Sequence, residues 1–457
     1  MLDKPIETLF IIFGSTGDLT HRKLMPAFYY LESKKLMPEN FAIVGIARKD
    51  KTNQDYRNEI KESIKKFTKY NKEEIITKLL NRIYYFKNDF DTEKDYSKLK
   101  NFLYELDLNY NTKGNRIFYL ATKPEHFESI IKNLKENQCI KKEQKNKIII
   151  EKPFGYDLKS AEKLNNILKQ LFSEESIYRI DHYLGKETVQ NLLALRYSNR
   201  IFESLWSNKD IKEIQISVLE NIGIENRGNY YDNYGSLKDM FQNHLLQLVS
   251  LVAMNNKKNK TEHIKKAKID VLKKIKIKKI VLGQYNGYLN EKDIKKKSIT
   301  DTFSAIKLEI NNKRWKNVPF FIRTGKNLKR KASEIVIIFK KSKNNDAENN
   351  ILRIRIQPDE GIHLQFNAKN PGNEFKLIPV SMDFCHECLF PLNTPEAYEK
   401  LIYDALVEDK TLFTSWEEVK QSWKIIDKIK KIKKPFIYEK NTWGPKEAGI
   451  TKWKEPL

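Results

Sequence analysis

The first third of the chain alternates between short apolar runs and segments with helical spacing. Residues 8–13 form a continuous apolar run, which is typical of a strand buried on both faces of a parallel sheet. A helical pattern follows through about Lys34, and similar strands are predicted at residues 41–46, 83–86, 116–121 and 147–151. This alternation of strand and helix predicts an α/β doubly wound parallel sheet.

The pattern changes in the second part of the chain. Residues 214–220 alternate apolar and polar positions, as expected of a strand with one covered face. Further alternating segments, at 302–310, 334–339 and 352–357, follow without regular helices between them. We therefore expect a larger α+β domain with a mostly antiparallel sheet. The predicted domains are residues 1–180 and 181–457.

A glycine-containing loop directly follows the first apolar run. It comprises Gly14, Ser15, Thr16, Gly17, Asp18 and Leu19. Strand, glycine turn and helix form the phosphate-binding arrangement of a Rossmann-type domain, because glycines let the backbone approach the phosphate and helix amides face it. The loop has Gly-x-x-Gly rather than Gly-x-Gly-x-x-Gly, so a plain tight turn is the alternative interpretation.

The end of the second predicted strand indicates which dinucleotide is used. NAD sites usually carry Asp or Glu near this point, to bind the ribose hydroxyls. This chain has Ala47, Arg48 and Lys49 instead, and a guanidinium can pair with a 2′-phosphate. We therefore predict NADP as the cofactor. The alternative is that Arg48 is one more exposed cation of a basic protein.

A polar turn lies where the two predicted domains meet. It holds Asp181, His182, Tyr183 and Lys186 between a predicted strand and a predicted helix. Buried polar groups are costly unless each finds a partner, whereas such a set can hold a small anion and fix a proton-transfer group. An ordinary charged surface turn is the alternative. Ligand sites often lie at domain interfaces, which favours the functional interpretation.

The net charge of +25 on 457 residues raises nucleic-acid binding as an alternative function. The lysines, however, are spread along the chain among Asn and Ile, and no nucleic-acid-binding motif is recognisable. We therefore expect no nucleic-acid partner. No apolar run approaches the roughly 20 residues of a membrane span, and the first residues do not form a signal peptide. We expect a cytoplasmic protein with no membrane partner.

The number and spacing of the cysteines argue against a disulfide framework and against a metal site. Cys139, Cys385 and Cys388 are too few for a disulfide framework, which fits a reducing compartment. Cys385 and Cys388 supply two metal ligands where a structural zinc normally needs four, and the sequence has no second paired cluster. We therefore predict no metal site.

Five strings of the chain resemble the glucose-6-phosphate dehydrogenase family. They are Gly-Ser-Thr-Gly-Asp-Leu at 14–19, Glu-Lys-Pro-Phe-Gly at 151–155, Asp-His-Tyr-Leu-Gly-Lys-Glu at 181–187, Asp-x-x-Gln-Asn-His-Leu-Leu-Gln at 239–247, and residues 315–326. The resemblance covers nearly the whole chain. One departure is Lys123, where the family usually has an apolar residue or proline.

The resemblance implies roles for individual residues. It implies that His244 is the general base and that Asp181 orients it. It implies a phosphate site of His182, Tyr183 and Lys186. Further substrate contacts are implied for Lys152, Glu220, Asp239, Lys326, Lys331 and Gln357. Coenzyme contacts are implied for the glycine loop, Lys23, Arg48, Tyr119 and Lys152.

The helical pattern around His244 does not by itself support a catalytic role. His244 lies on an apolar stripe with Met240 and Leu248, and a histidine in such a place more often belongs to the core. Asp239 lies roughly 140° around an α-helix from His244. Only the resemblance therefore indicates that these two side chains act together.

The resemblance also implies the reaction. This is oxidation of β-D-glucose 6-phosphate at C1 to 6-phospho-D-glucono-1,5-lactone with hydride transfer to NADP, the first step of the oxidative pentose phosphate pathway. A base with a near-neutral pKa suits removal of the C1 hydroxyl proton. A homodimer or homotetramer is the implied assembly. The alternatives are a sugar-phosphate sensor without catalysis and a dehydrogenase of another sugar phosphate.

Overall fold

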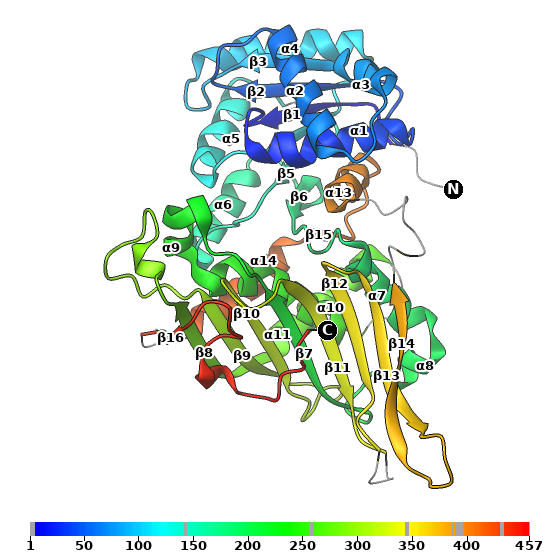
Figure 1. Cartoon of the computed structure of the whole chain (residues 1–457). Helices are drawn as coiled ribbons and strands as arrows, with labels where there is room; N and C mark the ends of the chain where they lie inside the picture. Colours follow the sequence, from blue (N-terminus) through cyan, green and yellow to red (C-terminus); the bar gives the residue numbers. More distant parts are fainter. Residues whose placement is uncertain are drawn as a thin grey trace. The chain divides into compact units, whose positions relative to one another are not determined.

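The chain forms two compact units, each with its own sheet (Figure 1). The first unit comprises Met1–Gly185 and Pro395–Lys420, and the second comprises Lys186–Thr394 and Gln421–Leu457. The computed structural model describes residues 5–140, 144–255, 260–342, 347–385, 388, 396–429 and 434–456.

The first unit is built on a seven-stranded sheet in the order β15-β6-β5-β4-β1-β2-β3. Its strands are β1 (Thr8–Phe13), β2 (Phe41–Ala47), β3 (Ile83–Lys87), β4 (Arg116–Leu120), β5 (Asn146–Ile150), β6 (Ile177–Ile180) and β15 (Phe413–Thr414). Strands β1 to β6 pair in parallel, and β15 joins β6 antiparallel. The predicted doubly wound parallel sheet is confirmed.

Helices flank this sheet (Figure 1). They are the π-helix η1 (Thr20–Leu24), α1 (Met25–Ser33), α2 (Asn53–Phe67), α3 (Glu73–Leu80), α4 (Lys94–Asn109), η2 (Pro124–His126), α5 (Phe127–Glu136), α6 (Leu158–Leu168), η3 (Glu174–Ser176) and α13 (Ala397–Leu406). Local sequence fixes some of their starts. Helix α2 begins with a capping box, in which the Thr52 hydroxyl accepts from the Asp55 amide and the Asp55 carboxylate accepts from the Thr52 amide.

The order of the strands reverses at β1, because β2 pairs with one side of it and β4 with the other. All six residues of β1 are buried, as its continuous apolar run predicts. In open α/β sheets, ligands bind beyond the carboxyl ends of the strands at such a switch point. The fold therefore puts the glycine loop, which follows β1, where a dinucleotide is expected.

The second unit has a nine-stranded sheet in the order β14-β13-β12-β11-β7-β10-β9-β8-β16. Its strands are β7 (Ile211–Leu219), β8 (Ile275–Tyr285), β9 (Phe303–Ile310), β10 (Phe320–Gly325), β11 (Ala332–Phe339), β12 (Ile351–Gln357), β13 (Gly361–Lys369), β14 (Leu377–Cys385) and β16 (Phe436–Tyr438). Two neighbouring pairs, β7–β10 and β8–β16, are parallel, and the others are antiparallel. The predicted mostly antiparallel sheet is confirmed.

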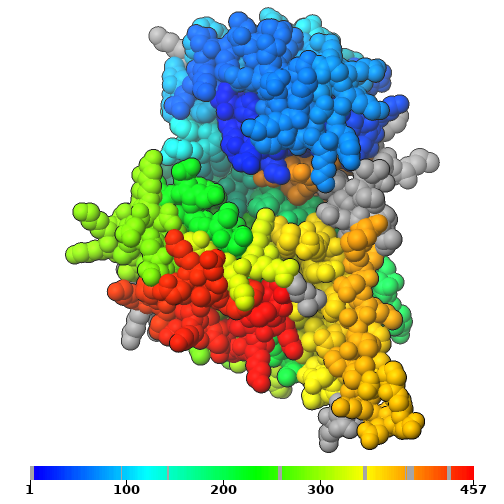
Figure 2. Space-filling view, in the orientation of Figure 1, coloured from blue at the N-terminus to red at the C-terminus, as the bar shows by residue number. Residues whose placement is uncertain are grey.

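Helices α7, α10 and α11 lie behind the strands of this sheet in Figure 1. The helices of the unit are α7 (Glu187–Ser198), α8 (Arg200–Leu205), η4 (Glu225–Arg227), α9 (Gly228–Ser236), the π-helix η5 (Leu237–Leu245), α10 (Leu246–Ala253), α11 (Thr261–Lys274), η6 (Tyr288–Asn290) and η7 (Lys446–Ala448). Helix α14 (Trp416–Asp427) contains the point where the chain passes from the first unit to the second. Residues 436–456, red in Figure 2, reach the surface. They are linked to β7 by a hydrogen bond that the buried Gln215 side-chain amide donates to the Lys452 carbonyl.

The lysine-rich segment before Gly283 forms the helix α11 and the first half of the strand β8. Strand β8 starts at Ile275 and continues through the whole Lys-Ile repeat, in which Lys276, Lys278 and Lys279 are exposed. A β-bulge at Lys278 shifts the pairing, so that Ile277 pairs with Leu308 and Ile280 with Ile306. Successive side chains of a regular strand point to opposite faces, so residues three positions apart would normally face opposite sides. The extra residue of the bulge offsets this, and Ile277 and Ile280 therefore lie on the same face.

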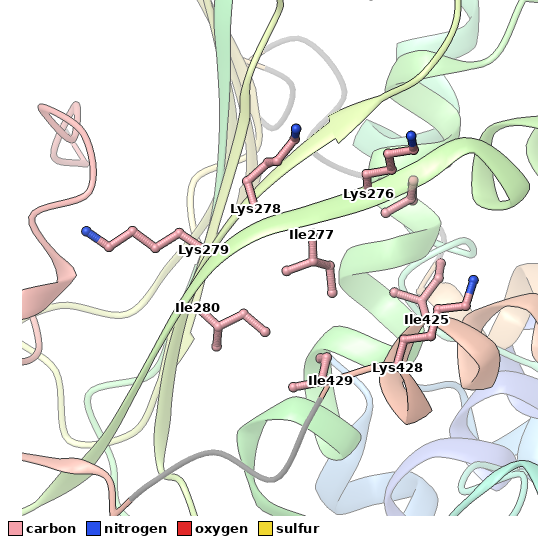
Figure 3. A pocket seen from close by; sticks show the side chains of 9 residues that line it. Lys276, Ile277, Lys278, Lys279, Ile280, Ile425, Lys428 and Ile429 are labelled. Atoms are coloured by element: carbon pink, nitrogen blue, oxygen red, sulfur yellow. The ribbon is translucent and has the colours of Figure 1, made fainter.

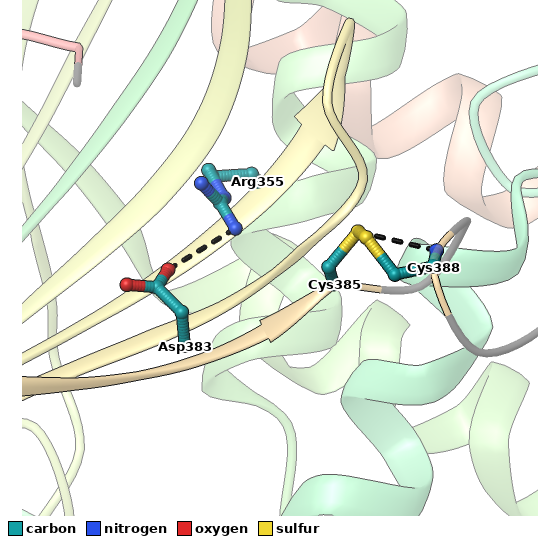
Figure 4. Close-up of a disulfide and its surroundings, with 4 residues drawn as sticks. All are labelled: Arg355, Asp383, Cys385 and Cys388. Carbon is teal, nitrogen blue, oxygen red and sulfur yellow. Dashed lines mark hydrogen bonds and ion pairs between the residues drawn. A yellow bond between two sulfur atoms is a disulfide. The ribbon is translucent and has the colours of Figure 1, made fainter.

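The structure joins Cys385 and Cys388 in a disulfide at the end of β14 (Figure 4). Their Cα atoms are 5.3 Å apart, which is within the usual range for a bridge. Cys139 is a buried free thiol. The bridge spans three residues of sequence, so it is a local link rather than a framework. Next to it, the Arg355 guanidinium pairs with the Asp383 carboxylate at 3.2 Å.

Candidate active site

The glycine loop of the first unit packs against the segment that follows β4. The Gly14 and Ser15 amides both donate to the Ile46 carbonyl, at 2.9 and 3.1 Å. Gly14 has φ +87°, and a Cβ atom there would lie 2.5 Å from the Ala121 carbonyl oxygen. Both the backbone conformation and the space therefore require glycine. This bare turn at the switch point fits the close approach of a coenzyme phosphate.

Two side chains predicted to contact the coenzyme differ in exposure. Arg48 is exposed directly after β2. Lys23, in η1, is about half exposed and pairs with Glu396 at 2.9 Å. Asp18 pairs loosely with Arg22 at 3.7 Å, and both are well exposed. The first unit thus presents cationic groups beside the glycine loop and at the carboxyl end of β2.

Glu151, at the carboxyl end of β5, is a functional candidate that the sequence reasoning did not assign. The Tyr119 hydroxyl donates to its carboxylate at 2.5 Å, and the Tyr398 hydroxyl donates to it as well. Burial raises the pKa of Glu151 to about 7, against the lowering effect of these two hydrogen bonds. Tyr119 was predicted as a coenzyme contact, and the structure places it fully in the core with its hydroxyl on Glu151. Lys152 follows immediately, before a cis Pro153.

The polar turn after β6 is organised by Asp181. Its side chain accepts from the Tyr183 amide at 3.0 Å, and its carbonyl accepts from the Leu184 amide at 2.9 Å. Asp181 and Tyr183 are buried, and His182 is half-buried, with its ring centroid 5.2 Å from that of Tyr183. Three predicted residues, Asp181, His182 and Tyr183, therefore form one compact turn at the end of a sheet strand.

In the second unit, Lys186 contacts Gln357 at the end of β12, and Gln357 in turn contacts Ser333 on β11. The Lys186 ammonium donates to the Gln357 amide oxygen at 2.5 Å, and the Gln357 nitrogen donates to the Ser333 hydroxyl at 3.0 Å. Lys331 is exposed and lines a small pocket together with Gln357. These contacts bring three predicted substrate residues, Lys186, Lys331 and Gln357, to the ends of β11 and β12.

Glu220 and Lys326 form an ion pair at the ends of two inner strands of the same sheet. Each residue directly follows a strand, Glu220 after β7 and Lys326 after β10. Because these strands are parallel neighbours, their carboxyl ends meet at one edge. The Lys326 ammonium also lies 5.7 Å from the ring centroid of the buried Tyr231.

Asp239 and His244 belong to the π-helix η5. In a π-helix the angle between these two side chains around the helix axis is smaller than in an α-helix. Both residues are buried. An α-helix would place them roughly 140° apart. A π-helix bonds residues five positions apart, which brings residues 239 and 244 onto successive turns. The Tyr230 hydroxyl donates to the Asp239 carboxylate at 3.1 Å. π-Helical turns often occur at functional sites.

A separate pocket of about 540 Å³ lies between β8 and the end of α14 (Figure 3). In this view Ile277, Ile280, Ile425 and Ile429 point into it, whereas Lys276, Lys278 and Lys279 point away. Its described lining includes none of the predicted site residues.

Neither a metal centre nor a membrane span is found within the described ranges. No three His, Cys, Asp or Glu side chains among those residues are grouped so that they could hold a metal ion. Across the same part of the chain, none of the helices is both long and apolar enough to cross a bilayer.

Comparisons with known proteins agree with both units. The family model described as glucose-6-phosphate dehydrogenase, NAD binding domain, matches residues 11–191, and the model described as glucose-6-phosphate dehydrogenase, C-terminal domain, matches residues 193–454. The glucose-6-phosphate 1-dehydrogenase of Chlamydia muridarum is 44% identical over 450 residues, which cover 92% of this chain and 89% of the relative. That of Bacillus subtilis is 41% identical over 473 residues, which cover 97% and 96%.

A solved structure extends this agreement to the fold. It is described as glucose-6-phosphate dehydrogenase in complex with its substrate glucose-6-phosphate, and it matches with a TM-score of 0.92 and 34% identity over 99% of this chain and 100% of that chain. A dinucleotide-binding unit followed by a large antiparallel unit defines an oxidoreductase that uses a nicotinamide coenzyme. The chain belongs to the glucose-6-phosphate dehydrogenase family.

Proposed function

We propose that this protein oxidises β-D-glucose 6-phosphate at C1 to 6-phospho-D-glucono-1,5-lactone, with NADP as the hydride acceptor, as the first step of an oxidative pentose phosphate pathway. The observation that carries the proposal is the pairing of Glu220 and Lys326 at the carboxyl ends of two parallel strands, in a member of this family. A carboxylate accepts hydrogen bonds and an ammonium donates them. Together they suit the neighbouring hydroxyls of a sugar.

The substrate phosphate is assigned to His182, Tyr183 and Lys186. A dianion is best held by several charge-assisted donors. The contact from Lys186 to Gln357 supports this role. It holds the Lys186 ammonium beside a second polar side chain, which lines the same small pocket as Lys331.

His244 is assigned as the general base that removes the proton of the C1 hydroxyl, since a neutral imidazole is a suitable base near pH 7. Asp181 is assigned to orient this imidazole and to stabilise its protonated form, as carboxylates do for other catalytic histidines. Asp239 and Lys152 are assigned to sugar hydroxyls. The hydrogen bond from Tyr230 supports a fixed position for the Asp239 carboxylate.

The coenzyme would bind to residues 1–180, the predicted NADP-binding domain, which lie within the first unit. The bare Gly14 turn would hold its phosphates, and the exposed Arg48 would pair with the 2′-phosphate. When bound, NADP supplies the hydride acceptor, and the protein supplies orientation and electrostatics. Residues 181–457 would bind the sugar phosphate and form a homodimer or homotetramer in the cytoplasm.

An assay of NADPH formation at 340 nm with glucose 6-phosphate tests the proposal. The wild type should be active, with a higher kcat/KM for NADP than for NAD. His244→Ala should lower kcat by about 10²- to 10⁴-fold, the usual contribution of a general base. His363→Ala, on β13, is the control and should keep wild-type activity.

Two results would contradict the proposal in different ways. A wild-type protein without activity on glucose 6-phosphate would contradict the substrate, and activity on another hexose phosphate would identify the nearest alternative. A His244→Ala variant with nearly full activity would contradict the base assignment alone. Light scattering on the purified protein tests the predicted oligomer.

A further inference from the structure

The dipeptide Asp301–Thr302, just before β9, contacts two parts of the second unit that carry proposed site residues. On one side lies the start of the helix η5, which contains Asp239 and His244. On the other side lies the turn after β10, which begins at Lys326. The sequence reasoning assigned no role to Asp301 or Thr302.

Asp301 holds the start of η5 through three hydrogen bonds. The Ser236 amide donates to the Asp301 carbonyl at 2.8 Å. The Asp301 carboxylate accepts from the Ser236 hydroxyl at 2.5 Å and from the Leu237 amide at 2.9 Å. The first amides of a helix have no partner within the helix, so a carboxylate from outside can satisfy one of them.

Gly235 allows this close approach. It has φ +62°, and a Cβ atom there would lie 2.7 Å from an Asp301 carboxylate oxygen. The backbone therefore turns sharply at Gly235 and enters η5 directly against Asp301. Ser236 is 1% exposed, so solvent cannot replace these hydrogen bonds freely.

Thr302 holds the other side. The Lys326 amide donates to the Thr302 carbonyl at 2.9 Å, and the Thr302 amide donates to the Gly283 carbonyl at 2.8 Å. The Tyr438 hydroxyl lies 3.0 Å from the Thr302 hydroxyl and donates to the Lys326 carbonyl at 2.7 Å. Thr302 is fully buried, and the backbone of Lys326 is thus fixed from both of its polar groups.

We propose that Asp301 is a positioning residue, which with Thr302 sets the distance between the helix carrying Asp239 and His244 and the turn carrying Lys326. It touches none of the reacting atoms. Its effect on catalysis rests on the proposed function, because the base and the sugar contacts must keep one geometry. A displacement of about 1 Å in such a group can cost roughly 100-fold in rate.

Three variants test this inference. Asp301→Ala should lower kcat at saturating substrate and coenzyme by about 10- to 100-fold. Asp301→Asn should recover kcat to within about threefold of the wild type, because its amide oxygen can accept the same two hydrogen bonds. The matched control is Asn312→Ala at the opposite end of β9, where the Asn312 side chain accepts from the Trp315 amide at 2.9 Å. This control should lower the melting temperature without changing kcat.

Amide hydrogen exchange separates this inference from the proposed function. Residues 237–246 should exchange faster in Asp301→Ala and at the wild-type rate in Asn312→Ala, whatever the substrate proves to be. Unchanged exchange in those residues, or an unchanged kcat in folded Asp301→Ala, would overturn the positioning role. Should Asp301→Ala fail to fold, Ser236→Ala removes one of the three hydrogen bonds and should show the same changes on a smaller scale.

Discussion

The Glu151 carboxyl illustrates how strongly a single group depends on its surroundings. Its residue type and its place at a strand end are visible in the sequence. Its two hydroxyl partners come from β4 and from α13, and burial is the largest cause of its raised pKa. Because Tyr398 lies far along the chain, the sequence pattern could not predict this environment.

Glu151 should make the folded protein less stable as the pH rises. Its pKa is raised from 4.5 to about 7, so between these values the folded state binds a proton that the unfolded state has released. Stability is therefore lost as the pH rises through this window. Glu151→Gln should remove this loss, so its melting temperature relative to the wild type should increase from pH 5 to pH 8 in thermal unfolding. The control is Glu74→Gln, an exposed carboxylate on α3. A difference between Glu151→Gln and wild type that is independent of pH would contradict the raised pKa.

Lys186 should contribute to substrate binding more than to turnover. Lys186→Ala removes a charge-assisted donor worth about 1.5–3 kcal/mol, so KM for glucose 6-phosphate should rise by about 10- to 100-fold with little change in kcat. Lys279→Ala, an exposed lysine on β8, should leave both constants unchanged. An unchanged KM in Lys186→Ala would exclude the phosphate role.

At the level of elements, the strand–loop–helix unit at β1 was predictable, and its tightest contact was not. The apolar run and the glycines indicate the motif. The close approach of Gly14 to the Ala121 carbonyl depends on the pairing of β1 with β4, which are separated by two other strands in sequence. The same holds for η5. The apolar spacing predicts a helix around His244, but it does not predict that the hydrogen bonds of this helix join residues five positions apart.

Two glycines, Gly14 in the loop after β1 and Gly287 just before η6, separate backbone strain from crowding. Gly14 has φ +87° and a carbonyl oxygen 2.5 Å from the Cβ position, whereas Gly287 has φ +89° and nothing nearer than 3.8 Å. Gly287→Ala should cost about 1–2 kcal/mol of unfolding free energy from strain alone. Gly14→Ala should cost more and should also weaken NADPH binding, measured by fluorescence titration. Equal costs in urea unfolding would show that the loop can move away from Ala121.

For the whole molecule, periodicity was enough to predict both fold classes, because each sheet has a distinct burial pattern. The order of strands at the sheet edges was not predictable. Short strands such as β15 and β16 have two and three residues and join partners far away in sequence. Their place is set by long-range pairing, which no local pattern records.

Coenzyme binding should stabilise the whole protein in proportion to its saturation. At 100 times its dissociation constant, NADP should add about 2.7 kcal/mol to the unfolding free energy, provided that it binds only the folded state. Thermal unfolding with equal concentrations of NADP and NAD measures this effect. The shift with NAD should be smaller if Arg48 pairs with the 2′-phosphate. Equal shifts would contradict that pairing.

The late return of the chain to the first unit affects how the protein is synthesised. Residues 413 and 414 complete the sheet beside β6, and the Trp416 amide and the Lys410 ammonium bind Glu174 just before that strand. A nascent chain that has not yet delivered these residues leaves the outer edge of β6 open on the ribosome. The first unit therefore cannot complete its sheet until residues 186–394, which form most of the second unit, have been translated.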